Sequence, residues 1–348
     1  MAKDNRLEQI PLSVLDLVPI PQGMTAADAI ANTRDLAQHA EEWGYRRYWL
    51  AEHHNMAGIA SSATSVLIGY VASQTKTIRV GSGGVMLPNH SPLVIAEQFG
   101  TLATIYPRRI DLGLGRAPGT DPGTMRALRC GLSLEEDFPQ HVEELSTLLG
   151  DDKPGQRLHA VPGTGTKVPI WLLGSSGFSA ELAGRMGLPF AFAAHFSPDN
   201  LLPALDLYRR SFRASEVLER RYTMVAIQVV AAESDERAKY LASTPYLSFL
   251  NLIRNRPGPM PPPVESLEGL ANEMEDIAIR SRFGAAVIGG PESVREQLEA
   301  LLERTEADEL MIVTGLYHHR DRLRSYEILT ELHGRLSASE PAVSGAIS

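Results

Sequence analysis

Two apolar stretches decide the fold: residues 78–87 read IRVGSGGVML, and residues 109–115 read RIDLGLG. Strands that are apolar along nearly their whole length are buried on both faces, as in a parallel sheet covered by helices. Six further stretches of this kind are expected as strands, at residues 12–20, 46–51, 168–174, 189–195, 222–231 and 309–315.

Helical patterns separate these strands. Thr25 and Asp28 form a predicted capping box, apolar side chains then recur at helical spacing as far as Trp43, and Gly44 supplies the left-handed end. Eight such strand–helix units fit an α/β fold, the (β/α)8 TIM barrel. The alternative is a doubly wound open sheet, but residues 19–23 (PIPQG) do not form the glycine loop that this fold prefers after its first strand.

Two connections are longer than the others. Residues 116–167 form an insertion after the fourth strand, and residues 232–308 form one between the seventh and eighth strands. The second contains RPGPMPPPV at 256–264, whose prolines exclude a helix, so we expect an extended run that is either a surface excursion or a lid over the barrel mouth. We expect residues 1–336 to form a single domain and residues 337–348 to form a disordered tail.

Composition excludes several classes of protein. The formal charge of −9 argues against a nucleic-acid binder, and no apolar run is long enough for a membrane span or a signal peptide. The single cysteine, Cys130, cannot form an internal disulfide, which favours a reducing compartment. With 43% hydrophobic and 22% charged residues, the chain has ordinary globular composition. The sequence therefore predicts a cytoplasmic protein with a large core.

In barrels of this class, functional side chains lie at the carboxyl ends of the strands. The second strand ends in Glu52-His53-His54-Asn55. Adjacent strand residues face opposite sides, so the two histidines do not readily share one ion, and we expect no metal site. A histidine here suits a general base or a hydrogen-bond donor, and the alternative is a purely structural role.

Two further strand ends carry candidate ligand-binding residues. Gly83 and Gly84 lie near the end of the third strand, where bare backbone suits either a flat ligand or a tight corner of the barrel. Arg116 follows the fourth strand, and its planar, permanently charged side chain suits a phosphate group. The alternative for Arg116 is an ordinary solvent-exposed arginine.

The fifth strand leads directly into a helix through Gly174, Ser175, Ser176, Gly177 and Phe178. Free amides at this helix start, the helix dipole and two hydroxyls suit an anion, whereas a simple N-cap explains only one of the serines. Because the fourth and fifth strands are neighbours in a barrel, we expect Arg116 to complete a phosphate clamp with this segment.

Four segments together resemble the bacterial luciferase-like flavin monooxygenase family, and most of all its single-gene bacterial members. They are WLAEHHN at 49–55, VGSGGVMLP at 80–88, RIDLGLGRAPGTD at 109–121 and WLLGSSGFSAELA at 171–183. The resemblance implies a barrel that binds FMN in its reduced form, delivered by a separate flavin reductase. It further implies a monooxygenase that inserts one oxygen atom of O2 into a small organic substrate through a flavin C4a-peroxide.

The resemblance also implies roles for individual residues. The flavin ring is expected on a bulge with a non-proline cis peptide at Gly83–Gly84, next to Val85. The phosphate is expected at Arg116 and residues 174–178, and His53 is expected beside the flavin as an acid–base group.

Two departures from the family pattern limit these implications. The light-emitting enzymes have alanines at the bulge, and they carry a reactive cysteine where this chain has Gly115, so bioluminescence is not implied. The substrate itself is not specified, and the pocket residues suggested for it are Met86, His90, His195 and Phe196.

Two other functions stay open at this point. Related barrels accept the deazaflavin F420, so an F420-dependent hydride-transfer oxidoreductase is one alternative. A non-catalytic flavin-binding protein is the other. The expected partners are a small-molecule substrate and, transiently, a reductase, and a homodimer is an expectation at the level of the family.

Overall fold

The computed structural model describes residues 6–117, 121–129 and 137–334. Eight of the nine strands in these ranges form a closed parallel ring, in which the last strand pairs with the first. The strands are β1 (Leu12–Asp16), β2 (Arg47–Leu50), β3 (Arg79–Met86), β4 (Ile110–Gly115), β5 (Ile170–Gly174), β6 (Phe190–Ala193), β7 (Thr223–Ala231), β8 (Val287–Gly289) and β9 (Glu309–Val313). The predicted (β/α)8 barrel is confirmed, and the open sheet is excluded.

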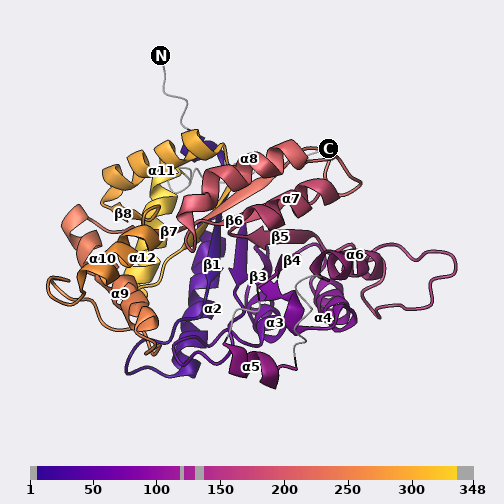
Figure 1. The fold of residues 1–348 in the computed structure, drawn as a ribbon, viewed down its shortest axis with the longest axis horizontal. Coiled ribbons are helices and arrows are strands. Elements are labelled where there is room, and N and C mark those ends of the chain that lie inside the picture. Colours follow the sequence, from indigo (N-terminus) through magenta and orange to yellow (C-terminus); the bar gives the residue numbers. More distant parts are fainter. Residues whose placement is uncertain (1–5, 118–120, 130–136, 335–348) are drawn as a thin grey trace, which may run out of the picture.

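Helices surround the ring of strands (Figure 1). They are α1 (Arg6–Gln9), α2 (Ala26–Glu42), α3 (Thr64–Gln74), α4 (Pro92–Ile105), α5 (Pro122–Ala127), α6 (Phe138–Leu149), α7 (Gly177–Met186), α8 (Leu201–Ser211), α9 (Asp235–Ile253), α10 (Glu273–Arg282), α11 (Pro291–Thr305) and α12 (His319–Leu332), with short 3-10 helices η1 (Leu87–Asn89) and η2 (Pro198–Asn200). Within the described ranges, none of them combines the length and the apolar character needed to cross a membrane. The predicted capping box is present at Thr25 and Asp28, and Gly44 has a φ of 77°.

Side-chain alternation along the strands divides the core into two layers. Leu15, Trp49 and Trp171 pack inside the barrel. Val14 and Tyr48, their neighbours in sequence, pack outside it in the larger layer between the strands and the helices. Both faces of each strand are therefore covered, which explains why the strands are apolar along nearly their whole length.

The short strand β8 was not among the predicted strands. It lies in the second insertion and pairs with Val229–Ala231, in the second half of β7. The first half of β7 pairs with β9 and so closes the barrel. Three residues are too few to give a periodic pattern, so only the length of β7 pointed to a further partner.

The proline-rich run is extended, as predicted. The backbone amide of Met260 donates to the carbonyl of Ile20 at 2.8 Å, and the amide of Gln22 donates to the carbonyl of Met260 at 2.8 Å. The run therefore lies against the loop that follows β1, at the carboxyl end of the barrel, and its role as a lid stays a prediction. Cys130 and the expected tail at 337–348 lie outside the described residues.

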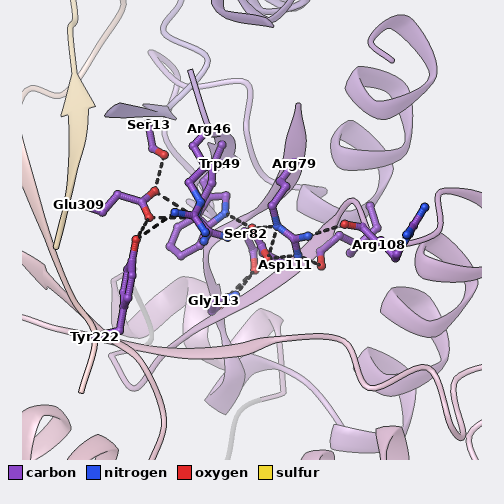
Figure 2. Close-up of polar contacts among 12 residues, drawn as sticks. Ser13, Arg46, Trp49, Arg79, Ser82, Arg108, Asp111, Gly113, Tyr222 and Glu309 are labelled. Atoms are coloured by element: carbon purple, nitrogen blue, oxygen red, sulfur yellow. Dashed lines mark hydrogen bonds and ion pairs between the residues drawn. The ribbon is translucent and has the colours of Figure 1, made fainter. Parts of the chain in front are cut away.

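A buried ionic network fills the opposite end of the barrel, where the strands begin (Figure 2). Arg47 in β2 contacts Asp111 in β4 at 2.7 Å and Glu309 in β9 at 3.0 Å. Arg79 in β3 also contacts Asp111, and Ser13 in β1 donates a hydrogen bond to Glu309. Ion pairs and a hydrogen bond thus link five strands at this end of the barrel, which we call the barrel floor.

The charges of this network hold each other ionised. Burial by itself raises the pKa of Asp111, but Arg47 and Arg79 outweigh burial and hold that pKa below its ordinary value. Asp111 therefore stabilises the folded state at neutral pH. Because the folded pKa is the lower one, this stabilisation is complete above the unfolded pKa and is lost as the pH falls through the folded value.

We expect Asp111→Asn to lower the free energy of unfolding by about 3–5 kcal/mol, because it leaves the buried Arg47 and the half-buried Arg79 without their shared carboxylate. Equilibrium urea denaturation at neutral pH measures this loss. The control is Asp151→Asn, since Asp151 forms an ion pair with Lys167 but is 73% exposed, and its loss is expected to cost at most about 1 kcal/mol. Equal losses in the two variants would contradict a special role for the network.

Candidate active site at the barrel mouth

The closed ring brings the carboxyl ends of the strands to one end of the barrel, where active sites lie in barrels of this class. The candidate residues all follow or end a strand: His53 follows β2, Gly83 and Gly84 belong to β3, Arg116 follows β4, and His195 follows β6. We refer to this end as the barrel mouth.

The third strand carries the expected bulge. The Gly83–Gly84 peptide bond is cis, and the pairing of β3 with β4 shifts register between Ser82 and Val85. A Cβ atom on Gly83 would lie 2.6 Å from Leu15 Cδ1, and one on Gly84 would lie 2.7 Å from the Gly113 carbonyl oxygen. Packing within the barrel thus accounts for both glycines, as the tight-corner alternative supposes, without a ligand.

Arg116 lies at the start of α7, as the barrel order predicts. Its Cζ atom is 4.3 Å from the centre of the Phe178 ring, in the first turn of that helix. Among the residues that the structure describes, none forms a hydrogen bond or ion pair with the guanidinium. The cation is therefore positioned by stacking, and its donors are available to a ligand.

The start of α7 is also without a cap. Ser176 occupies the N-cap position, but its side chain makes no capping hydrogen bond. The first amides of the helix, from Gly177 onward, therefore have no partner within it. The strand and helix join closely at Gly174, where a Cβ atom would lie 2.6 Å from Ser179 Cβ. Free amides beside an unpaired arginine fit a phosphate group.

Glu52 forms the polar centre at the ends of β2 and β3. Its Oε1 atom accepts hydrogen bonds from His54 Nε2 and His90 Nε2, both at 2.8 Å, and its Oε2 atom accepts one from the Met86 amide at 3.0 Å. Burial raises the pKa of Glu52, but these hydrogen bonds outweigh it and leave the pKa below its ordinary value. An ionised Glu52 therefore holds both imidazole rings in place.

These three side chains also have metal-ligand geometry. The ligand atoms of Glu52, His54 and His90 all lie within 4.8 Å of one another. Alternation along the strand separates His53 from His54, but His90 follows the next strand and reaches Glu52 beside His54. In the structure both rings donate to the carboxylate, so hydrogen bonds alone account for the arrangement, and the absence of a metal stays a prediction.

His53 takes no part in the hydrogen bonds that the structure shows for this cluster. Its backbone amide donates to the Ser61 carbonyl at 2.9 Å, and its side-chain Nδ1 atom is buried with no hydrogen-bond partner in the described structure. Burial lowers the pKa of His53 below its ordinary value, although Glu52 opposes this effect. The ring is therefore neutral at pH 7 and carries an unused polar atom, which a bound ligand can contact.

His195 and Phe196 lie at the other side of the mouth. Burial, reinforced by the nearby charge of Arg282, lowers the pKa of His195 to about 4. Its Nδ1 atom is 3.4 Å from the Ala226 carbonyl oxygen, which only an N–H can approach favourably, so Nε2 is left as an acceptor. His53 contributes to this lowering of the pKa as well, but no hydrogen bond joins the two rings in the described structure.

The four residues suggested for a substrate pocket fall into two pairs with different neighbours. Met86 and His90 belong to the Glu52 cluster, whereas His195 and Phe196 lie near Arg282. Sequence reasoning missed the role of Glu52, although this residue directly precedes His53 in the strand-end motif. It also missed Arg282, whose helix lies in the second insertion and has no sequence signal that separates it from a surface helix.

A further contact joins the mouth to the first insertion. Asn55 Nδ2 donates to Asp121 Oδ2 at 3.2 Å, and Asp121 caps α5. A cavity of about 520 Å³ lies beside this contact, lined in part by His54, Thr124 and Leu128. Only the fold brings these residues together, since they come from different loops.

Comparison with known proteins now defines the family. The family of luciferase-like monooxygenases matches residues 10–309. A luciferase-like monooxygenase of Escherichia coli K12 is 50% identical over 328 residues, which cover 94% of this chain and 98% of the relative. The N-acetyl-S-alkylcysteine monooxygenase of Bacillus subtilis 168 is 34% identical over 329 residues, which cover 92% of this chain and 98% of the relative.

Solved structures agree with this result. MsnO8, in its apo form, has a TM-score of 0.83 and 34% identity, and the match covers 93% of this chain and 98% of that one. The oxygenating constituent of 3,6-diketocamphane monooxygenase from Pseudomonas putida, in complex with FMN, has a TM-score of 0.71 at 18% identity, covering 92% and 97%. An F420-dependent secondary alcohol dehydrogenase has a TM-score of 0.66 at 14% identity, covering 93% and 99%, and these two share the fold alone. From the matched length and the identity of its relatives, the chain belongs to the luciferase-like monooxygenase family and is an oxidoreductase.

Proposed function

We propose that this protein is an FMN-dependent monooxygenase that takes reduced FMN from a separate reductase and transfers one oxygen atom of O2 to a small organic substrate. The observation that carries the proposal is the unpaired Arg116 guanidinium, stacked on the first turn of an uncapped helix. A phosphate-bearing cofactor matches both features. The monooxygenase relatives and the FMN complex of a protein with the same fold support the choice of flavin and reaction.

The residues at the mouth fit FMN as follows. Arg116 and the free amides at the start of α7 would hold the phosphate, with Ser175 and Ser176 as further donors. The bulge at Gly83–Gly84 would lie against the flavin ring. Bound reduced FMN supplies the two electrons with which O2 is activated.

The protein's own acid–base group in this proposal is His53. Its ring is neutral at pH 7 and its Nδ1 atom is buried without a partner. A neutral imidazole both accepts and donates a proton near neutral pH. His195, whose ring is also neutral, keeps an acceptor at Nε2 at the same end of the barrel.

The first prediction concerns the phosphate. We expect Arg116→Ala to weaken FMN binding about 10- to 100-fold, the loss that corresponds to a charge-assisted hydrogen bond of about 1.5–3 kcal/mol. Binding of riboflavin, which lacks the phosphate, should change little. Fluorescence titration with each flavin measures both constants.

The matched control for this experiment is Arg185→Ala. Arg185 lies at the other end of α7, where it is 64% exposed and paired with Glu181. This variant should bind both flavins like the wild type. If Arg116→Ala weakens riboflavin as much as FMN, the phosphate assignment is wrong.

A second prediction concerns His53. We expect His53→Ala to keep its affinity for FMN but to change the rate at which O2 reoxidises the bound reduced flavin by about tenfold or more, because proton transfer by a positioned group commonly contributes at least that much. Stopped-flow absorbance after anaerobic loading measures this rate. His159→Ala, in the exposed loop before β5, is the control. An unchanged rate in His53→Ala would remove the proposed role.

A third prediction concerns the choice of cofactor, which an anaerobic titration tests. The full chain is titrated without oxygen with reduced FMN and, separately, with reduced F420. We expect FMN to bind and its oxidation by O2 to differ in rate from that of free reduced FMN. Binding of F420 alone would contradict the proposal and favour hydride transfer. Tight FMN binding with unaltered oxidation, both alone and with each of a panel of organic substrates, would favour a flavin-binding protein without turnover.

A further inference from the structure

The second insertion places one cationic side chain at the barrel mouth. Arg282 ends α10, and its Cζ atom lies 5.2 Å from the centre of the Phe196 ring, which follows β6. The preceding residue, Ser281, lies 3.4 Å from Asp199 in η2, so the end of α10 rests on the segment after β6. A residue distant in sequence from the barrel strands thereby becomes part of the mouth.

Aromatic rings surround Arg282 on several sides. Its Cζ atom is 5.7 Å from the centre of the Phe249 ring and 5.6 Å from that of Phe283, in addition to Phe196. Rings attract a guanidinium through their faces, but they do not accept its N–H groups as a carbonyl or carboxylate does. The rings therefore hold the charge in position and leave its hydrogen-bonding capacity unused.

Arg282 has no counter-ion in the described part of the chain. Its Nη1 atom is buried without a hydrogen-bond partner, and no ion pair involves this side chain. Burial lowers the pKa of Arg282 to about 10, so the group is still charged at neutral pH. A partly buried charge with an unpartnered buried nitrogen is costly to the folded state, and an anion bound there would remove that cost.

The titratable groups around Arg282 do not supply this anion. Asp199 contacts the hydroxyl of the neighbouring Ser281, but it forms no ion pair with Arg282 in the described structure. His195 lies close enough for Arg282 to affect its charge, but its ring is neutral, and so is that of His53 beyond it. Arg116 follows β4, which is two strands from β6 in the ring, and it marks the side proposed for the cofactor phosphate. At the end of β6 the mouth thus holds one partly buried cation, the neutral imidazole of His195 and an exposed phenyl ring, with Phe196 63% exposed.

We propose that Arg282 binds the carboxylate of the substrate, and that the substrate is therefore a small organic acid whose apolar part packs against Phe196. A single planar guanidinium matches a carboxylate, which accepts two parallel hydrogen bonds from it. The inference rests on the proposed function, because that proposal assigns the cofactor phosphate to Arg116 and the start of α7 and so leaves Arg282 to the substrate. It specifies the class of substrate, which the proposed function leaves open.

The test compares an acid with its neutral counterpart. The probes are 4-phenylbutanoate and 4-phenylbutanamide, which share an apolar body and differ in charge. Their binding to the full chain is measured by ligand-observed NMR and calorimetry, first with the protein alone and then with FMN present. We expect the wild type to bind the acid about tenfold or more tightly than the amide, as a charge-assisted hydrogen bond implies.

Three variants test whether Arg282 causes the tighter binding of the acid. Arg282→Gln should abolish it, whereas Arg282→Lys should keep part of it, because lysine retains the charge but lacks the planar pair of donors. Arg280→Gln removes the same charge from an exposed position on the same helix and should keep the full preference. Circular dichroism checks that each variant is folded.

Some results would overturn this inference, and a different result would count against the proposed function. Equal binding of acid and amide by the wild type, absence of binding by both, or an equal loss in Arg280→Gln and Arg282→Gln would overturn the inference. Failure of FMN to bind, with the preference for the acid intact, would instead count against the proposed function. Loss of the preference with FMN binding intact would count against the inference alone.

Discussion

The contact between Arg47, Asp111 and Glu309 is the constraint on which the rest of the barrel depends. These charges come from β2, β4 and β9, and Arg79 and Ser13 extend their hydrogen bonds to β3 and β1. Removing any partner from this network would leave a buried charge uncompensated and destabilise the fold, so the strands must begin in one register relative to one another. A fixed register at the floor also fixes where each strand ends, and thus where the residues of the mouth stand.

The floor and the mouth differ in how fully their polar groups are paired. At the floor, each charged group has several partners. At the mouth, Arg116 is held by stacking, His53 keeps a buried nitrogen without a partner, and Arg282 is charged and unpaired in the described structure. Unpaired buried groups lower the stability of a fold, and they persist where a ligand completes them. The unpaired groups at the mouth are therefore the ones proposed to contact ligands, whereas the network at the floor maintains the fold.

The sequence predicted the features that depend on neighbouring strands or on local pattern. The apolar strands predicted the barrel. The order of the strands predicted that Arg116 lies beside the start of α7, and the structure shows it there. The pairing of Glu52 with His90 was missed, because its partner follows the next strand and nothing in the local pattern joins them. The position of Arg282 depends on how a long insertion folds back, and an amphipathic helix gives no sign of which arginine faces the barrel.

The division of β7 between two partners has a consequence for how this enzyme can change. One half of β7 completes the ring with β9, and the other half pairs with β8, which belongs to the insertion. The insertion is thus attached to the wall by main-chain hydrogen bonds, which any side chains can make. During evolution, the exposed positions of α9 and α10 can acquire new side chains while ring closure is preserved, whereas the side of α9 that packs on β7 through Ala238, Leu241 and Ala242 is constrained. The barrel would then serve as a constant frame, and substrate choice would diversify at the exposed positions of the insertion beside it.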